Sequence, residues 1–289
     1  MAMARLDSRV ELISADSMQV YRGMDIGTAK PTVAEQKEVR HHVIDVIDPH
    51  EDYGVSRFQS DARQAIQDIH SSARRAVIVG GTGLYVRAVV DDLDIPDQYP
   101  EVRKEIDAES NTAALYARLL GLDPVAAGRM DPENRRRVTR ALEVCVGSGR
   151  PFSSFGPGME RYPEVPFVQV GVERTRGDID ERIALRYAQQ MQDGFLDEVR
   201  TLVANPGGMS RTARQALGYK ELLLHIEEGL PLFEALDLAG QRTRRFARRQ
   251  QKWFRRDPRI LWLDGTVDPV RLAEQVLSGD VTSLAEHTK

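Results

Sequence analysis

Two short segments of the sequence combine residue types that can do chemistry. The segment Ser14–Gln19 contains one carboxylate, Asp16, and directly follows the apolar run Val10–Ile13. A carboxylate at this place can act as a general base, bind a magnesium ion or cap a helix, and capping is the commonest fate of an Asp-Ser pair. The residues alone leave all three interpretations open.

The second segment is the turn Gly80–Gly83, which follows the apolar run Ala76–Val79 and precedes a helical pattern that starts at Leu84. Glycines let a backbone approach a ligand closely, and a helix N-terminus presents free N–H groups to an anion. Thr82 adds a hydroxyl group to this turn. Many α/β proteins have a similar turn for packing only, so the motif predicts an anion site only in combination with other features.

Both segments must be positioned by a sheet. Short β-branched runs alternate with helical patterns, which indicates an α/β fold with a parallel sheet, and the expected strands cover residues 10–13, 76–79, 167–172 and 260–263. Ligands of such sheets bind outside the carboxyl ends of the strands. We therefore expect Asp16 and the glycine turn to meet at one rim of the sheet.

Helical patterns separate the expected strands. Apolar spacing predicts a helix over residues 56–73. The segment Asp178–Glu181 has the form of a capping box and opens a second helix, whose apolar stripe runs from Ile183 to Leu202 before Pro206-Gly207-Gly208 ends it.

The stretch from Pro96 to Pro166 differs from its flanks because helical patterns follow one another there without an intervening strand. They cover residues 102–109, 112–120, 124–130 and 132–146. We interpret the stretch as a helical insertion, so that residues 1–95 form the first part of the core, 96–166 the insertion and 167–289 the second part of the core. Cys145, on the last of these helices, is predicted to be a core residue.

Composition narrows the class of protein. The chain has 289 residues, of which 41% are hydrophobic, and it contains one cysteine and no run of 18 apolar residues. These features, with a start that lacks an apolar signal region, favour a soluble cytoplasmic protein without a membrane segment. The tandem His41-His42 lacks zinc-like spacing and is predicted to form structural hydrogen bonds rather than a metal site.

Positive charge is concentrated in two segments. Arg135–Arg140 holds four arginines, and Arg242–Arg256 holds eight basic residues, with no acidic residue in either. The net charge of −4 becomes −16 without these twelve, since 28 basic residues then face 44 acidic ones. Such a concentration predicts a surface that binds a polyanion such as a nucleic acid. On the second segment, helical spacing predicts a packing face that is formed by Ala239, Thr243, Phe246, Gln250 and Trp253.

Several motifs together resemble one enzyme family. Asp16-Ser17-Met18-Gln19-Val20-Tyr21-Arg22-Gly23-Met24-Asp25-Ile26-Gly27-Thr28-Ala29-Lys30-Pro31 closely resembles the signature of the tRNA dimethylallyltransferases, which are the bacterial tRNA isopentenyltransferases. Further matches follow in the family's order across essentially the whole chain, namely His41–Asp45, Val79–Tyr85, Arg140–Val144, Gly218–Glu221 and Arg249–Arg255.

This resemblance implies a P-loop-NTPase-like parallel core with a helical insertion, a core type associated with nucleotide (ATP) binding. It also implies transfer of a dimethylallyl group from dimethylallyl diphosphate to N6 of the adenosine just 3′ of the tRNA anticodon, with release of diphosphate aided by Mg²⁺. By the match Asp16 is the general base, and Thr82 donates a hydrogen bond near the leaving diphosphate and the target nucleotide. The target base leaves its stack to reach the site.

The resemblance further assigns binding residues, with the tRNA anticodon stem-loop and dimethylallyl diphosphate as partners of a monomer. The residues expected to bind tRNA are Asp16, Ser17, Met18, Gln19, Thr82, Arg103, Arg136, Arg137, Val138, Thr139, Arg140, Arg245, Arg249 and Lys252. Those expected near the diphosphate are Gly81, Thr82 and Arg214. Arg214 is assigned only by adjacency, because many relatives carry an arginine at the position of Gln215.

One departure from the family leaves two readings of function. Family members begin with a strand and a G-x-[TS]-x-x-G-K-[ST] type of loop that holds diphosphate and magnesium, whereas this sequence starts at about the helix that follows and contains no Walker A motif. The sequence thus predicts either an active enzyme whose recorded start is displaced or a truncated remnant that binds tRNA and transfers poorly. A small-molecule kinase with a helical lid is a third reading, which the absent Walker A motif disfavours.

Overall fold

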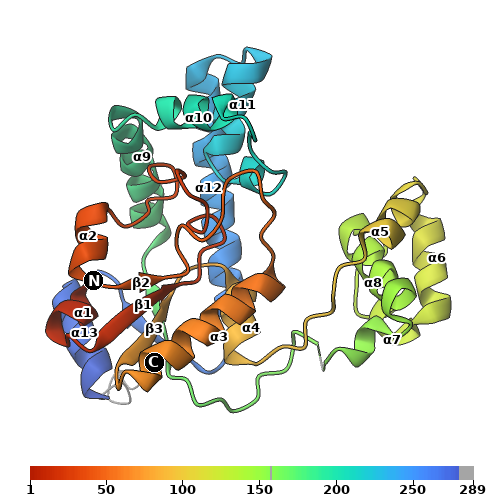
Figure 1. The fold of residues 1–289 in the computed structure, drawn as a ribbon, viewed down its shortest axis with the longest axis horizontal. Helices are drawn as coiled ribbons and strands as arrows, with labels where there is room; N and C mark the ends of the chain where they lie inside the picture. Colours follow the sequence, from red (N-terminus) through yellow and green to blue (C-terminus); the bar gives the residue numbers. More distant parts are fainter. Residues whose placement is uncertain (157, 280–289) are drawn as a thin grey trace. The chain divides into compact units, whose positions relative to one another are not determined.

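A computed structural model describes residues 1–156 and 158–279 of the chain, and it divides into two compact units (Figure 1). The larger unit, called the core unit below, is formed by Met1–Val89 together with the chain from Pro166 onward. The smaller unit, called the insertion, is Val90–Val165. Each unit has a hydrophobic core of its own.

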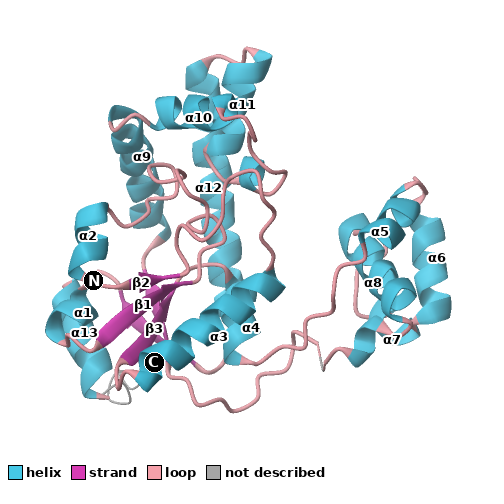
Figure 2. Ribbon diagram, in the orientation of Figure 1, coloured by secondary structure: helices cyan, strands magenta, loops and turns pink. Residues whose placement is uncertain are grey.

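The core unit contains two parallel sheets, and Figure 2 labels the strands of the first. The first has the order β2-β1-β3, with β1 (Val10–Ser14) between β2 (His41–His42) and β3 (Arg75–Val79). The second pairs β4 (Gln169–Glu173) with β5 (Ile260–Asp264). The four predicted strands are confirmed within two residues, while β2 was missed because a two-residue strand has no periodicity to detect.

The central strand β1 is buried along its whole length, which explains its continuous apolar pattern. Its one ionisable residue, Glu11, is also buried and is therefore paired. The Glu11 carboxylate lies 2.6 Å from Nε2 of His42 and accepts a hydrogen bond from Arg74 at 2.9 Å. Nδ1 of His41 lies 2.7 Å from the Val39 carbonyl oxygen. The histidine pair thus forms the structural hydrogen bonds that its sequence context predicted.

Helices pack around these sheets. Among them, α3 packs on β1 and β3 through Phe58, Ala62, Ala65 and Ile69, and α12 is the long helix whose C-terminal end lies nearest the sheet (Figure 1). None of the helices in the described part of the chain combines the length and apolar character needed to cross a bilayer. The helices of the core unit are α1 (Ala2–Leu6), α2 (Val33–Glu38), α3 (Val55–Ser71), α4 (Gly83–Val90), α9 (Arg176–Gln192), α10 (Phe195–Ala204), α11 (Tyr219–Glu228), α12 (Leu232–Phe254) and α13 (Pro269–Ser278).

Two helix predictions need correction. The apolar stripe up to Leu202 does not lie on one helix, because the chain turns at Gly194, whose φ of 96° ends α9 and starts α10. The predicted capping box at Asp178 is also wrong. Thr175 caps α9 by accepting a hydrogen bond from the Asp178 amide at 3.2 Å, while the Asp178 carboxylate pairs with Arg174. The break between α9 and α10 falls at Gly194 because glycine adopts positive φ without steric cost.

The insertion is helical, as its sequence pattern predicted, with α5 (Pro100–Asp107), α6 (Thr112–Leu122), α7 (Pro124–Ala127) and α8 (Arg135–Ser148). These helices enclose an apolar cluster that includes Ile106, Leu119 and Leu142. Cys145 belongs to the same cluster, as predicted, and its burial raises the pKa of the thiol. The insertion therefore has its own apolar core, which stabilises the packing of its helices.

Candidate active site and nucleic-acid interface

The two chemically promising loops meet at one rim of the first sheet, as the sequence predicted. The Ala15 amide donates to the Val79 carbonyl at 2.8 Å and so extends the β1–β3 pairing by one residue. The Thr82 amide donates to the Ala15 carbonyl at 3.3 Å, and the Thr82 hydroxyl oxygen accepts from the Ser17 amide at 3.3 Å. These bonds fasten the glycine turn to the loop that carries Asp16.

Asp16 caps its own loop with one carboxylate oxygen. Oδ1 accepts hydrogen bonds from the amides of Met18 at 2.8 Å and Gln19 at 3.3 Å. Within the described chain Oδ2 has no hydrogen-bond partner, and the residue is only half-buried. The capping and general-base interpretations are therefore compatible, because capping occupies only one of the two carboxylate oxygens.

Other parts of the protein closely approach the three glycines of the turn. A Cβ atom on Gly80 would lie 2.4 Å from the Ala15 carbonyl oxygen. A Cβ atom on Gly81 would lie 1.9 Å from Nε2 of Gln250, and one on Gly83 would lie 2.1 Å from Nε1 of Trp253. The chain itself thus fills the space above each glycine. Packing by itself accounts for these glycines, and a close approach of their backbone to a ligand stays a prediction.

Helix α12 supplies two of those neighbours. Gln250 donates from its side-chain amide to the Gly81 carbonyl at 3.0 Å, and Trp253 lies against Gly83. On the same face, Thr243 shares a 2.8 Å hydrogen bond with the Tyr187 hydroxyl and Ala239 is fully buried. The predicted packing face is right at these four positions. Phe246, predicted on the same face, is 38% exposed instead.

The cations of α12 and of the two residues that follow it fall into two groups. Arg242 pairs with the buried Glu221, and Arg255 pairs with Glu173. In contrast, Arg245, Arg249 and Lys252 are exposed and have no carboxylate partner within the described residues. Arg249 and Lys252 are the chain neighbours of Gln250 and Trp253, so free positive charge lies within one helical turn of the contacts to the glycine turn. Arg248 and Arg256 are exposed as well.

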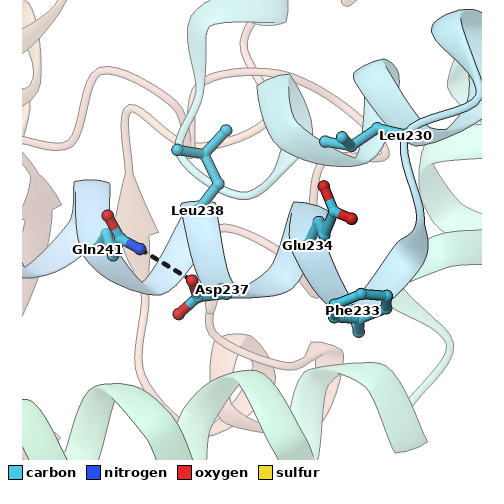
Figure 3. A pocket seen from close by; sticks show the side chains of 6 residues that line it. All are labelled: Leu230, Phe233, Glu234, Asp237, Leu238 and Gln241. Carbon is cyan, nitrogen blue, oxygen red and sulfur yellow. Dashed lines mark hydrogen bonds between the residues drawn. The ribbon is translucent and has the colours of Figure 1, made fainter.

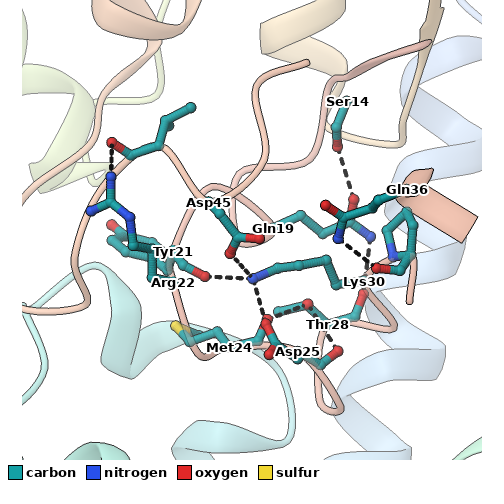
Figure 4. A network of polar contacts seen from close by, with 12 residues as sticks. Ser14, Gln19, Tyr21, Arg22, Met24, Asp25, Thr28, Lys30, Gln36 and Asp45 are labelled. Atoms are coloured by element: carbon teal, nitrogen blue, oxygen red, sulfur yellow. Dashed lines mark hydrogen bonds and ion pairs between the residues drawn. The ribbon is translucent and has the colours of Figure 1, made fainter. Parts of the chain in front are cut away.

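A buried lysine organises the loop between Asp16 and Pro31 (Figure 4). The Lys30 ammonium group donates to the Tyr21 carbonyl at 2.7 Å and pairs with the carboxylates of Asp25 and Asp45, while only 2% of its side chain is exposed. A buried cation requires such partners. The sequence shows these residues within its motifs but gives no sign that they contact one another.

The polar atoms of Gln19 are committed to the same loop. Its amide nitrogen donates to the carbonyls of Thr28 at 3.2 Å and Ala29 at 3.3 Å, and its amide oxygen accepts from the Ser14 hydroxyl at 2.9 Å (Figure 4). Met18 packs at the edge of the core cluster. The Gln19 side chain therefore joins the beginning of this loop to its end at Thr28 and Ala29.

The insertion residues predicted to bind tRNA differ in accessibility. Arg136 and Arg137 are exposed, whereas Val138 and Thr139 are fully buried, and the Thr139 hydroxyl donates to the Arg135 carbonyl. A tRNA contact from the last two side chains is wrong, because the i, i+3, i+4 periodicity of α8 turns them into the core of the insertion.

Two further insertion arginines are held by one buried carboxylate. Arg140 donates to Glu143 at 2.7 Å and to the Pro96 carbonyl at 2.7 Å. Arg103 lies 3.6 Å from the same carboxylate and pairs with Asp107 at 2.9 Å. Their guanidinium groups thus make contacts within the insertion, and no local pattern distinguishes these two arginines from Arg136 and Arg137.

Arg214 is also engaged, since it pairs with Glu227. The neighbouring Gln215 accepts a hydrogen bond from Lys220 at 2.8 Å. An anion could recruit Arg214 only in competition with the Glu227 carboxylate, so its assignment to diphosphate stays a prediction.

Glu198, on α10, is an organising residue that the sequence did not reveal. Its carboxylate accepts hydrogen bonds from the consecutive amides of Asp25 at 3.0 Å, Ile26 at 2.7 Å and Gly27 at 3.2 Å, and from the Tyr219 hydroxyl at 2.5 Å. Burial raises the pKa of Tyr219, and the neighbouring Glu198 raises it further. These partners lie up to 173 residues apart in the chain, so no local pattern connects them.

A surface pocket lies at the other end of α12 from the glycine turn (Figure 3). Gln241 donates to Asp237 at 2.8 Å at one side of this pocket. Its lining includes neither Asp16 nor Thr82, and two of its side chains are carboxylates, which would repel an anionic substrate. The pocket is lined by Leu230, Phe233, Glu234, Asp237, Leu238 and Gln241.

Comparisons with known proteins agree on one family. The IPP transferase family model matches residues 19–257. A curated tRNA dimethylallyltransferase of Kineococcus radiotolerans is 47% identical, over 92% of this chain and 85% of that protein.

Solved structures give the same result. The tRNA isopentenylpyrophosphate transferase of Bacillus halodurans has a TM-score of 0.69 and 34% identity, covering 98% of this chain and 92% of that one. The structure of a eukaryotic dimethylallyltransferase acting on tRNA has a TM-score of 0.78 and 25% identity, covering 98% of this chain and 75% of that one. These likenesses agree with the predicted α/β fold with parallel strands.

Proposed function

The chain belongs to the IPP transferase family, and from this premise we propose that it is a tRNA dimethylallyltransferase that moves a dimethylallyl group from dimethylallyl diphosphate to tRNA. The acceptor atom in this proposal is N6 of the adenosine 3′-adjacent to the anticodon. The observation that carries the proposal is the junction of the Asp16 loop and the glycine turn at Thr82, beside a helix with free cations.

The proposed reaction exchanges one bond for another. N6 of the adenosine forms a bond to C1 of the dimethylallyl group as the bond between C1 and the diphosphate oxygen breaks, and the diphosphate leaves with that electron pair. The N6 proton passes to Oδ2 of Asp16, because an exocyclic amine is a poor nucleophile until its proton is withdrawn. Met18 and Gln19 orient the carboxylate through Oδ1.

Thr82 lies on the glycine turn at the point where the turn contacts the Asp16 loop. Its amide and its hydroxyl oxygen are tied to Ala15 and Ser17. The hydroxyl also has a proton to donate, which here points to Ser17 Oγ over a long 3.5 Å contact. Since a contact of that length is weak, we propose that this proton turns toward the leaving diphosphate when substrate binds, beside the Gly81 backbone.

Recognition of the tRNA rests on the exposed cations. Arg245, Arg249 and Lys252 follow the backbone of the anticodon stem-loop in this proposal, and Arg136 and Arg137 add contacts from the insertion. The target adenosine leaves its stack, because an atom inside a base stack is out of reach. Ser17 and Met18 lie next to Asp16, where the extruded base would be received.

Magnesium fits this proposal only as a companion of the diphosphate. No group of three or more His, Cys, Asp or Glu residues is placed to hold a metal ion within residues 1–156 and 158–279. Mg²⁺ commonly binds through substrate phosphates and water with few protein ligands.

Two readings compete with transfer. The remnant that binds tRNA without prenylating it is not favoured by the comparisons, because relatives that share most of their length with this chain are named as the transferase. The kinase reading receives no support from the comparisons either, and ATP hydrolysis by the purified chain would revive it.

The test is transfer of radiolabelled dimethylallyl from its diphosphate to unmodified tRNA, with Asp16→Asn compared with Asp48→Asn. Asp48 is a surface residue paired with Arg22, so its substitution is a matched loss of one carboxylate. Loss of a general base lowers kcat about 10²- to 10⁴-fold, and this is the effect expected for Asp16→Asn alone. An Asp16→Asn enzyme with full labelling would remove Asp16 from the reaction. Salt-sensitive tRNA binding without labelling by the unaltered chain would identify the remnant instead.

A further inference from the structure

The loop between Gln19 and Lys30 is held from outside by two side chains of distant helices. Glu198 of α10 accepts the amides of residues 25–27, as described above. Gln190 of α9, which is 6% exposed, donates to the carbonyls of Ile26 at 2.6 Å and Gly27 at 3.2 Å. Both the donors and the acceptors of this short backbone segment are therefore bound by side chains.

The loop carries this restraint back to Asp16. Gln19 binds the carbonyls of Thr28 and Ala29, one and two residues after the clamped segment, and its own amide donates to Oδ1 of Asp16 at 3.3 Å. Lys30 ties Asp25 to the Tyr21 carbonyl within the same loop and to Asp45 outside it. Glu198 is thus connected to the Asp16 carboxylate by hydrogen bonds at both ends of the short backbone stretch from Asp25 to Ala29.

We propose that Glu198 is a positioning residue for prenyl transfer, which sets the orientation of Asp16 through the clamped loop. The inference rests on the proposed function, because it assigns Glu198 an effect on the same reaction. A carboxylate is suited to the task, since it accepts all four hydrogen bonds while an amide side chain has only one oxygen to accept them. Glu198 itself touches neither substrate nor reacting atoms in this account.

Close packing at Gly27 holds the loop backbone against α10 and α11. A Cβ atom on Gly27 would lie 2.2 Å from the Phe195 ring and 2.4 Å from the Tyr219 ring. These two rings stand edge to face with centroids 4.8 Å apart and are fully buried. The loop backbone is therefore pressed against α10 and α11 at the place where the Glu198 carboxylate receives it.

The first test compares Glu198→Gln with Asp197→Asn, a control that removes the neighbouring carboxylate of α10, which is 78% exposed and pairs only with Arg200 among the described residues. We expect Glu198→Gln to lower kcat for transfer about 10- to 100-fold, the effect of a misplacement on the order of 1 Å. The KM values for both substrates should stay within about twofold, because ground-state binding is unchanged. The control should match the unaltered enzyme.

A double substitution separates positioning from general damage. If Glu198 acts through Asp16, the Asp16→Asn/Glu198→Gln enzyme is no slower than Asp16→Asn alone, because no base remains to be misplaced. Losses that multiply would overturn the proposal and make Glu198 a general structural residue.

Amide hydrogen exchange tests the clamp without any activity. Peptides that cover residues 16–30 should exchange faster in Glu198→Gln than in Asp197→Asn, and unchanged exchange would overturn the proposal. If the unaltered chain transfers nothing while exchange responds as expected, the proposed function fails and the clamp remains as a structural finding. The two failures are therefore distinguishable.

Discussion

The side-chain amide of Gln250 donates a hydrogen bond to the Gly81 carbonyl oxygen, 3.0 Å away, across 169 residues of sequence. This contact joins the cationic helix α12 to the turn that carries Thr82. It places the cation-rich helix directly against the candidate catalytic rim within the core unit. The position of this helix would therefore determine where an RNA backbone bound to α12 lies relative to Asp16.

Removal of that contact should affect transfer more than folding. A single hydrogen bond contributes about 0.5–1.5 kcal/mol to stability, so Gln250→Ala should lower the free energy of unfolding by no more than that. We expect kcat/KM for tRNA to fall about tenfold, because a shift of the helix misplaces the bound RNA. Gln251→Ala, one residue on, is the control, and steady-state kinetics with urea unfolding provide the measurement. Equal effects from both substitutions would contradict this prediction.

Glycine substitutions should separate close packing from open space. Gly80→Ala places a methyl group 2.4 Å from a backbone oxygen that cannot move aside, and we expect a loss of about 1–3 kcal/mol in the free energy of unfolding. Gly121→Ala is the opposite case, because no described atom lies within 4 Å of the added carbon on helix α6. There we expect a gain of about 0.5–1 kcal/mol. Thermal and urea unfolding of both variants measure these effects, and a neutral Gly80→Ala would disprove the packing argument.

The free cations of α12 should determine the salt dependence of tRNA binding. Each of Arg245→Ala and Arg249→Ala should reduce the slope of log K against log salt by about one unit if it removes one phosphate contact. Arg271→Ala, which removes an exposed cation from α13, should leave the slope unchanged. Filter binding across a salt series gives the slopes. A response to Arg271→Ala as large as the other two would mean that overall charge, rather than a surface on α12, binds the RNA.

Two neighbouring arginines of the insertion should act by different routes. Arg140→Ala leaves the buried Glu143 without its nearest cation, and a buried acceptor that loses a charged partner costs about 1–3 kcal/mol. Its weaker tRNA binding should therefore accompany a lower melting temperature. Arg136→Ala should weaken tRNA binding with an unchanged melting temperature, because Arg136 is exposed. Calorimetry and tRNA titration distinguish the two routes, and identical melting temperatures would count against the role of Arg140.

The single cysteine reports on the integrity of the insertion. Cys145 is 8% exposed, and its burial raises the pKa of the thiol. At neutral pH less reactive thiolate is therefore present than for a free cysteine. We expect slow labelling by a thiol reagent in the native state, an increase only as the pH rises through the raised pKa, and rapid labelling in denaturant. Rapid native labelling at neutral pH would show that α8 is not packed as described.

The sequence by itself determined the local elements of this protein. Four strands follow from β-branched runs, and the helices of the insertion follow from apolar spacing, because both signals repeat within a few residues. The long motif around Asp16 was sufficient to indicate the family, which the comparisons then showed. Even the meeting of Asp16 with the glycine turn was predictable, since parallel strands place their carboxyl ends at the same rim.

Tertiary structure decided which side chains are available for function. Arg242 and Arg249 look alike in the sequence, yet only the first meets a buried carboxylate. The glycines of the turn look like a ligand cradle, yet Gln250 and Trp253 fill the space above two of them. Glu198 has no signature at all. The physical reason is common to these cases: pairing and burial depend on which groups the folded chain brings within about 3 Å, and those groups lie tens to hundreds of residues beyond the reach of any local pattern.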